Sequence, residues 1–500
     1  MPADRPMRGR RSRCAGFPRR RTAPPDRRYG PALPRPTAKA ASPRPPHPPR
    51  RHPPRHANPS FPPDSGGSAS HPPVSAATTS FPPESGGNAW VCAASQGIRA
   101  FSPFRGVASV RFMESPLVAR MSEHSTSVFA EMSDLARRTE SINLGQGFPD
   151  TDGPAEIAEV ARACIADGRG NQYPPAPGIP ELRLAISAHS DRFYGLTVNP
   201  DTDVVVTTGA SEAIQSALLA LIEHGDEVIL FEPWFDIYAA GISLADGIRV
   251  GVPLTGSDLR PDIDALRDAI TPRTKVLLLN SPHNPTGVVF TQPELEAIAE
   301  IAIERDLIVI SDEAYEHLWF DDHRHIPIAT LPGMWERTIT IGSGGKTFSF
   351  TGWKVGWAYG PARLINAVKV VRQHLSFVSG GPFQYAIAHG LGMPDQYFNE
   401  FRHDLSAKRD LLSGGLAELG LRTILSQGTY FLTTDVRPLG YDDGLTFCRD
   451  IAERARVVAI PHQLLCDDEG IAAQYVRWAF CKKPEVLNEA ISRLSAGLNA

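Results

Sequence analysis

The sequence has no apolar run of about 18 residues, the length that a membrane-spanning helix needs. Its six cysteines are scattered and none stands in CxxC or CxH spacing, so the chain lacks both a zinc signature and a disulfide framework. Thiols without such a framework indicate a reducing compartment, and we expect a cytoplasmic protein with no metal site. A membrane protein, a collagen-like protein and a disulfide-stapled domain are therefore excluded.

Acidic residues are scarce in the first 112 residues, which hold 19 Lys and Arg but only 4 Asp and Glu. The same stretch contains 23 of the chain's 46 prolines. This composition cannot bury enough apolar surface to fold alone, so residues 1–112 are predicted to form a disordered Pro/Arg-rich extension. No apolar segment follows Arg19–Arg21, so we expect no export signal.

A basic tail of this kind can contact nucleic acid through its charge. An inert extension, or sequence upstream of a true start at Met113 or Met121, is the simpler interpretation because low-complexity composition carries little functional information. We therefore expect no nucleic-acid partner and no membrane partner.

From about residue 125 the pattern changes to short β-rich apolar runs that alternate with longer helical stretches. The expected strands are residues 204–208, 228–231, 276–280, 307–311, 338–341 and 355–359. Strands that alternate with helices predict an α/β fold with a mostly parallel sheet wrapped in helices. In such sheets ligands bind at the carboxyl ends of the strands, so the residues that follow each strand are the candidate site.

Two of these strand ends indicate a flat, anionic ligand. The small residues Ala210 and Ser211 follow the first strand and open a helix, whose N-terminus favours a phosphate. This segment has neither a GxxxxGK[ST] nor a GxGxxG pattern, so alone it could be an ordinary turn. Phe235 follows the second strand and could stack on a ring, or belong to the core.

Three further strand ends carry polar groups. Asn284 offers an amide donor, although Asn-Pro-Thr-Gly is also turn chemistry. Asp312 ends a buried strand and needs a partner, such as a protonated ring nitrogen, because an unpaired buried charge is costly. Lys346 lies in a Gly/Ser loop and is a candidate for a Schiff base. The coincidence of these groups and Tyr315 at successive strand ends favours one shared ligand.

Several motifs together resemble the class I aminotransferases of pyridoxal-phosphate fold type I, over residues 128–494. They are NLGQGFPD at 143–150, NQY at 171–173, PHNPTG at 282–287, DEAY at 312–315 and GKTFSFTGWKVG at 345–356. The chain is similar to the kynurenine/glutamine–phenylpyruvate/methionine aminotransferase branch and to actinobacterial N-succinyldiaminopimelate aminotransferases. Lys354 stands where the wider family has arginine, a departure that the kynurenine branch shares.

The resemblance implies a role for each matching residue. Lys346 would form a Schiff base with pyridoxal 5'-phosphate, and Asp312 would pair with its ring nitrogen. Asn284 and Tyr315 would contact the ring oxygen of the cofactor, and Phe235 would cover the ring face. The phosphate would be bound by Ala210, Ser211, Ser343 and Lys354, and by Tyr173 from the neighbouring subunit. The substrate would contact Gly147, Arg477, Asn284 and Phe129.

The resemblance also implies an architecture and an activity. A large domain at 157–390 would hold a mostly parallel seven-stranded sheet, residues 113–156 and 391–500 would form a smaller α/β domain, and the enzyme would be a homodimer. It would move the amino group of an L-amino acid to a 2-oxo acid. A cysteine-conjugate carbon–sulfur β-lyase is the first alternative. A DNA-binding regulator is remote, because the proline-rich tail has no helix-turn-helix pattern.

The substrate stays open at this point. N-succinyl-LL-diaminopimelate with 2-oxoglutarate would need a second cation for distal carboxylates, and the candidates are His374, Arg372, Lys369 and His462. Kynurenine, glutamine or methionine type substrates would suit an apolar pocket, for which the candidates are Phe129, Tyr173 and Phe377.

Overall fold

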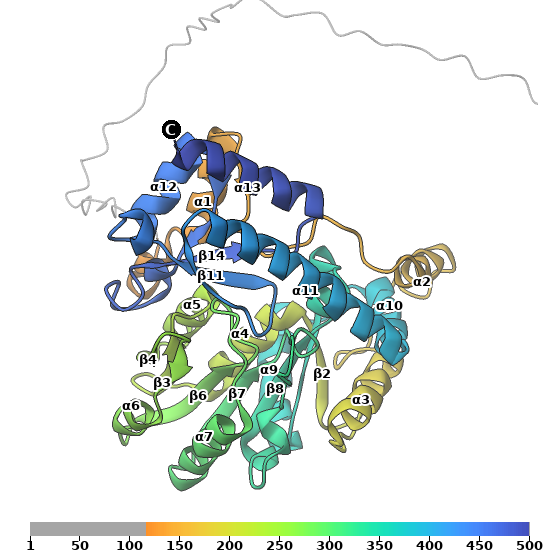
Figure 1. Cartoon of the computed structure of the whole chain (residues 1–500). Coiled ribbons are helices and arrows are strands. Elements are labelled where there is room, and N and C mark those ends of the chain that lie inside the picture. The colour runs from red at the N-terminus through yellow and green to blue at the C-terminus, as the bar shows by residue number, and fades with distance from the viewer. Residues whose placement is uncertain (1–116, 500) are drawn as a thin grey trace, which may run out of the picture. The chain divides into compact units, whose positions relative to one another are not determined.

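The computed structural model describes residues 117–499. The expected extension at 1–112 and the start of the predicted segment 113–156 lie outside the described residues. The described part forms two main sheets with helices packed on them (Figure 1).

The large sheet has the strand order β2-β9-β8-β7-β6-β3-β4-β5. Its strands are β2 (Val204–Thr208), β3 (Glu227–Glu232), β4 (Ile248–Thr255), β5 (Arg260–Pro261), β6 (Thr274–Asn280), β7 (Ile308–Asp312), β8 (Thr338–Ser343) and β9 (Val355–Tyr359). Every pair from β8 through β4 is parallel, whereas β9 runs antiparallel to both of its neighbours and β5 antiparallel to β4. The expected mostly parallel sheet is confirmed, and the two-residue β5 adds an eighth strand at its edge.

Helices cover both faces of this sheet, because successive strand residues point to opposite sides. One face packs on α4 (Gly209–Leu221), α5 (Asp236–Leu244) and α9 (Ala362–Leu375). The other packs on α6 (Ile263–Asp268) and α7 (Gln292–Glu304), and, near β2 and β9, on α2 (Ala155–Ala166), α3 (Pro180–Tyr194) and α10 (Gly381–Leu391). The apolar strands are buried on both sides, as their unbroken Val/Ile/Leu runs predict.

The second sheet is antiparallel, in the order β10-β11-β14-β13. Its strands are β10 (Arg422–Ile424), β11 (Phe431–Asp435), β13 (Ile460–Pro461) and β14 (Tyr475–Ala479). It shares a core with α1 (Val128–Arg138), α11 (Asp395–Glu418), α12 (Gly444–Arg454) and α13 (Pro484–Leu498) (Figure 1). A short parallel pair, β1 (Ile142–Asn143) with β12 (Val457–Val458), joins the segment after α1 to the C-terminal part of the chain.

No helix among residues 117–499 combines the length and the apolar character that crossing a membrane requires. Short single-turn helices connect several elements, and the one that bears on the site is α8 (Gly344–Thr347), directly after β8. The sequence predicted a loop there, but the amide of Phe348 donates to the carbonyl of Gly344 at 3.0 Å and closes a helical turn.

Candidate active site

A cavity of about 310 Å³ opens at the carboxyl ends of the large sheet's strands. Twelve of the thirteen residues predicted from the sequence line it: Phe129, Gly147, Ala210, Ser211, Phe235, Asn284, Asp312, Tyr315, Ser343, Lys346, Lys354 and Arg477. The large sheet supplies most of them from the turns after β2, β3, β6, β7 and β8, and the second sheet supplies Arg477 from β14. The sheet therefore brings together residues that lie far apart in the sequence.

Lys346 projects into this cavity from α8. Its Nζ lies 2.7 Å from the hydroxyl oxygen of Tyr430 and donates to the carbonyl of Gly147 at 3.2 Å. Burial lowers the pKa of Lys346 to about 8, and the nearby Arg477 charge acts in the same direction. A buried amine with a lowered pKa is a nucleophile and a base near neutral pH.

Asp312 ends β7 with its carboxylate buried. Its Oδ2 accepts from the hydroxyl of Tyr238 at 2.7 Å, and its Oδ1 accepts from the backbone amide of Ala314 at 3.1 Å. The side-chain amide of Asn280 fixes the same turn by donating to the Asp312 carbonyl at 2.8 Å. Burial raises the pKa of Asp312, although the Tyr238 hydrogen bond opposes this shift. Such a carboxylate gains most from a cationic partner.

Arg477 is buried on β14 and reaches the edge of the large sheet. Its Nη1 donates to Oδ1 of Asn284 at 2.9 Å, and its Nη2 donates to the carbonyl of Gly145 at 2.5 Å. Its Nε is buried and has no hydrogen-bond partner among residues 117–499. The guanidinium thus holds the loop that carries Gly147 and retains a donor for an anionic ligand.

A cradle for an anion lies at the start of α4. Gly209 has φ +74°, which favours glycine, and a Cβ there would lie 3.1 Å from Lys354 Nζ. Lys354 Nζ donates to Ser211 Oγ at 3.4 Å. A Cβ on Gly356 would meet the Gly209–Ala210 backbone within 2.5 Å, so close packing there also requires a glycine.

Pyridoxal phosphate fits this donor set. The cradle with Lys354 suits its phosphate, the buried Asp312 suits its ring nitrogen, and the Lys346 amine suits its aldehyde. Phe235 borders the cavity and meets Phe129 edge to face, with ring centroids 6.1 Å apart.

Tyr173 is the one predicted site residue that this cavity does not include. Its side chain is 82% exposed, and its ring meets that of Phe377 edge to face at 5.6 Å. Phe377 is exposed as well. Within one chain, these two rings therefore form an aromatic pair on the surface.

The four candidate cations for a distal carboxylate do not line the cavity either. Arg372 is buried and donates to the carbonyl of Ala176, Lys369 donates to the carbonyl of Thr202, and His462 is buried beside Thr433. His374 is exposed near the end of α9. Within one chain, none of the four supplies a second carboxylate contact.

The structure adds site residues that the sequence reasoning missed. The cavity wall also contains Gln146, Phe148, Ile214, Ala314, Thr351, Val355 and Phe431. Tyr238 and Tyr430 contact Asp312 and Lys346. Tyr238 lies three residues after Phe235, one helical turn along α5, and that spacing could have indicated it. No local pattern singles out Tyr430.

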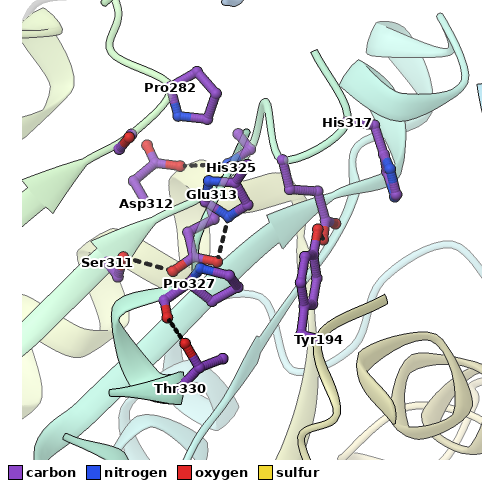
Figure 2. A network of polar contacts seen from close by, with 12 residues as sticks. Tyr194, Pro282, Ser311, Asp312, Glu313, His317, His325, Pro327 and Thr330 are labelled. Carbon is purple, nitrogen blue, oxygen red and sulfur yellow. Dashed lines mark hydrogen bonds and ion pairs between the residues drawn. The ribbon is translucent and has the colours of Figure 1, made fainter. Parts of the chain in front are cut away.

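A second buried polar network follows Asp312 along the chain (Figure 2). Glu313 accepts from Ser311 Oγ at 2.8 Å and pairs with His325 Nε2 at 2.9 Å, and the Tyr194 hydroxyl donates to Glu316 at 2.7 Å. Burial raises the pKa of Glu316 to about 8. A protonated Glu316 avoids the cost of an unpaired buried charge, and the hydrogen bonds of this network anchor the turn after β7.

Comparisons with known proteins agree with this geometry. The family model for aminotransferase class I and II matches residues 139–494. The probable N-succinyldiaminopimelate aminotransferase DapC of Mycobacterium tuberculosis is 51% identical over 388 residues, which cover 76% of this chain and 98% of that protein. A solved N-succinyldiaminopimelate aminotransferase from the same organism has a TM-score of 0.74 and covers 76% of this chain and 99% of its own.

More distant relatives carry related activities. The methionine aminotransferase of Escherichia coli is 36% identical over 382 residues, with 76% of this chain and 98% of that protein covered. The human kynurenine–oxoglutarate transaminase 3 is 36% identical over 393 residues, with 73% and 87% covered. The chain therefore belongs to the class I and II aminotransferases and is a pyridoxal-phosphate-dependent transaminase that moves an amino group from an L-amino acid to a 2-oxo acid.

Proposed function

We propose that the amino donor and acceptor pair is N-succinyl-LL-diaminopimelate and 2-oxoglutarate, in amino-acid biosynthesis in the cytoplasm. The observation that carries this proposal is the 51% identity to the mycobacterial N-succinyldiaminopimelate aminotransferase across 98% of its length, against 36% for the methionine and kynurenine enzymes. A common α-carboxylate site around Arg477 serves all of these donors.

In this proposal Arg477 and the Gly147 segment bind the substrate α-carboxylate. A guanidinium presents a planar fork that matches a carboxylate, and Arg477 lines the cavity with a buried Nε that no described residue of the chain engages. Asn284 and Tyr315 hold the ring oxygen of the cofactor, while Phe235 covers its ring. Ala210, Ser211, Ser343 and Lys354 bind its phosphate, and Phe129 forms a wall beside the substrate.

The cofactor, when bound, supplies an electron sink for the charge that develops when the α-proton leaves. Lys346 is the base that takes this proton, because its Nζ lies beside Gly147, where the carboxylate is held. Asp312 keeps the ring nitrogen protonated, since an opposite charge at short range favours the charged form.

A second candidate is the kynurenine, glutamine or methionine type of donor. The observation that favours it is the aromatic lining of the cavity by Phe129, Phe148 and Phe431. Among the described residues, the wall holds no cation besides Lys346, Lys354 and Arg477, so none is left over for a distal carboxylate. An apolar wall discriminates weakly between such side chains, by about 1–3 kcal/mol per methylene.

The deciding experiment is a half-reaction on the purified holoenzyme with one donor at a time. The donors are N-succinyl-LL-diaminopimelate, glutamate, glutamine, methionine and kynurenine, and absorbance follows conversion of the cofactor aldehyde to its amine form. Fast conversion by the succinylated compound and glutamate alone supports the first proposal. Fast conversion by glutamine, methionine or kynurenine, and none by the succinylated compound, supports the second.

Lys346→Ala is the control for this experiment, and it should abolish conversion by every donor. Substantial conversion in that variant would contradict the proposed role of Lys346. Absence of conversion in the wild type, with pyruvate and ammonia released from a cysteine conjugate, would favour the carbon–sulfur β-lyase.

We also propose that the enzyme is a homodimer in which Tyr173 completes the phosphate site of the neighbouring subunit. The exposure of the Tyr173–Phe377 pair, outside its own chain's cavity, supports this. Co-expressed Tyr173→Ala and Lys346→Ala chains test it, because a mixed dimer then contains one native site. Activity well above that of either variant alone supports the proposal, and no recovery contradicts it.

A further proposal concerns two domains, a large one at 157–390 and a smaller one from 113–156 with 391–500. Gly147 and Arg477 then belong to the smaller domain, while Lys346 and Asp312 belong to the larger one. Closure of the small domain over a bound substrate would exclude water. Equal solvent accessibility of the site, by hydrogen exchange with and without a dicarboxylate analogue, would contradict closure.

A further inference from the structure

Tyr430 lies immediately before β11 and is 1% exposed. Its hydroxyl oxygen is 2.7 Å from Lys346 Nζ and 2.5 Å from the carbonyl oxygen of Gly147. It therefore joins the reactive lysine to the loop that the proposed function assigns to the substrate carboxylate. No sequence motif pointed to this residue.

The chemistry of the three groups fixes the direction of each hydrogen bond. A carbonyl only accepts, so Tyr430 donates its single hydrogen to Gly147, and its oxygen must accept from Lys346. A second N–H of Lys346 points to the same Gly147 carbonyl at 3.2 Å. Both hydrogens of a neutral Lys346 amine are thereby used, and the lone pair occupies the remaining tetrahedral direction.

The protonation states agree with this arrangement. Burial raises the pKa of Tyr430 well above its usual value, so the phenol keeps its proton. Burial lowers the pKa of Lys346 to about 8, so a neutral amine is well populated at mildly alkaline pH. The triangle of Lys346, Tyr430 and Gly147 thus holds its hydrogens in one defined pattern.

The Tyr430 ring is held firmly enough to direct another side chain. Its backbone carbonyl accepts from the amide of Phe480 at 3.0 Å, and the next amide, that of Phe431, donates to Thr429 Oγ1 at 3.0 Å. The ring meets Tyr315 edge to face at 5.2 Å. A Cβ on Gly147 would lie 2.9 Å from Tyr430 Cε2, so the loop and the ring are already in contact.

We propose that Tyr430 is a positioning residue that sets the direction of the Lys346 lone pair, both for capture of the cofactor aldehyde and for removal of the substrate α-proton. The inference rests on the proposed role of Lys346. In capture, the amine nitrogen forms a C=N bond with the aldehyde carbon, and the aldehyde oxygen leaves as water with the two amine hydrogens. A misdirected lone pair slows this addition without removing any reacting group.

Tyr430→Phe tests the proposal, because it deletes the hydroxyl and keeps the ring. The first readout is the rate of aldehyde capture when pyridoxal phosphate is added to cofactor-free protein, followed by absorbance. We expect capture to slow by about 10-fold, and steady-state kcat to fall by about 10-fold to 100-fold with KM within about twofold of wild type. Tyr441→Phe is the matched control, since it loses a hydroxyl contact to Asp450 away from the cavity.

The pH profile of capture distinguishes positioning from a merely structural role. The Tyr430 oxygen accepts from the Lys346 amine and supports its ammonium form, so its loss should move the half-maximum of capture to lower pH. A variant that is only less well folded would lower the amplitude and leave the half-maximum in place. Capture by Tyr430→Phe at the wild-type rate and with the wild-type profile would overturn the proposal.

Lys346→Ala separates this inference from the proposed function. If that variant still forms a C=N bond with the aldehyde, the role assigned to Lys346 fails, and the inference about Tyr430 fails with it. If Lys346→Ala captures nothing while Tyr430→Phe behaves as wild type, only the inference fails. Slowed capture in Tyr430→Phe, with normal capture in Tyr441→Phe, supports both.

Discussion

Arg477 donates a 2.9 Å hydrogen bond to the side-chain oxygen of Asn284, 193 residues away in the sequence. The proposed carboxylate-binding residue and a proposed ring-binding residue therefore form one unit. Because the Asn284 oxygen is engaged, its NH₂ group is the donor left for a ligand. Burial lowers the pKa of Arg477 to about 10, which still leaves the guanidinium charged at neutral pH.

Arg477→Lys should raise KM for amino donors by about 10-fold to 100-fold, because a lysine cannot reproduce the two contacts to Asn284 and Gly145 together with a third to substrate. Steady-state kinetics with a fixed 2-oxo acid measure this. Arg493→Lys, on the exposed side of α13, is the control and should leave KM unchanged. A KM within twofold of wild type in Arg477→Lys would remove Arg477 from the carboxylate site.

The sequence predicted the sheet and most of the candidate site for one physical reason. Buried parallel strands are recognisable as apolar runs, and their carboxyl ends meet at one edge, so residues such as Asp312 and Lys346 could be placed together. Strands β2 and β9 have the predicted bounds. Strand β4, next to the edge strand β5, was missed because its residues are mostly half-exposed and mix glycine and proline with apolar residues.

Contacts between residues that lie far apart in the chain could not be predicted from the sequence. Tyr430 reaches Lys346 across 84 residues, and no local periodicity marks it. Tyr238 reaches Asp312 across 74 residues, and only its helical spacing from Phe235 could have indicated it. In the proposed homodimer Tyr173 would act in the neighbouring subunit, and a pattern within one chain cannot place a contact between two chains. Lys346 lies in a helical turn and not in the predicted loop, because a backbone hydrogen bond closes that turn. The glycines around Lys346 are compatible with both conformations, so the sequence could not distinguish them.

The reactivity of Lys346 should depend on pH with a midpoint near 8. The protonated amine has no lone pair, so capture of the aldehyde by cofactor-free protein should be slow at low pH and rise as pH passes the lowered pKa of about 8. An ordinary lysine would place this rise at about 10.4. Stopped-flow absorbance from pH 6 to 10.5 measures it, and a midpoint near 10 would show that burial does not tune this amine.

Gly209→Ala should weaken the binding of pyridoxal phosphate, whereas Gly195→Ala should lower the stability of the fold by a similar amount without affecting that binding. Both Gly209 and Gly195 have positive φ, at +74° and +66°, so alanine at either position carries a backbone cost of about 1–2 kcal/mol. Only at Gly209 would the new Cβ crowd Lys354 Nζ, at 3.1 Å, whereas no atom of the described part of the chain lies within 4 Å of a Cβ on Gly195.

Two measurements separate these effects. The thermal unfolding midpoint of the cofactor-free protein should fall by a similar amount in both variants. The Kd for pyridoxal phosphate should rise by about 10-fold or more in Gly209→Ala alone, the equivalent of about 1.4 kcal/mol. Equal Kd values in the two variants would argue against a phosphate cradle at the start of α4.

Tyr238→Phe should move the acidic limb of the kcat profile to higher pH. The Tyr238 hydroxyl donates to Asp312 at 2.7 Å and favours the carboxylate, so its loss raises the pKa of Asp312 further, in the direction that burial already sets. A hydrogen bond to a charged group contributes about 1.5–3 kcal/mol, which corresponds to a limb shift of about one pH unit or more.

Asp312 becomes protonated as pH falls through its pKa, and a neutral acid no longer holds the ring nitrogen in its protonated form. Activity should therefore be lost at the acidic end and recover as pH rises, with KM unchanged. Tyr441→Phe should keep the wild-type profile, and an unshifted acidic limb in Tyr238→Phe would mean that Asp312 does not need this hydroxyl to stay ionised.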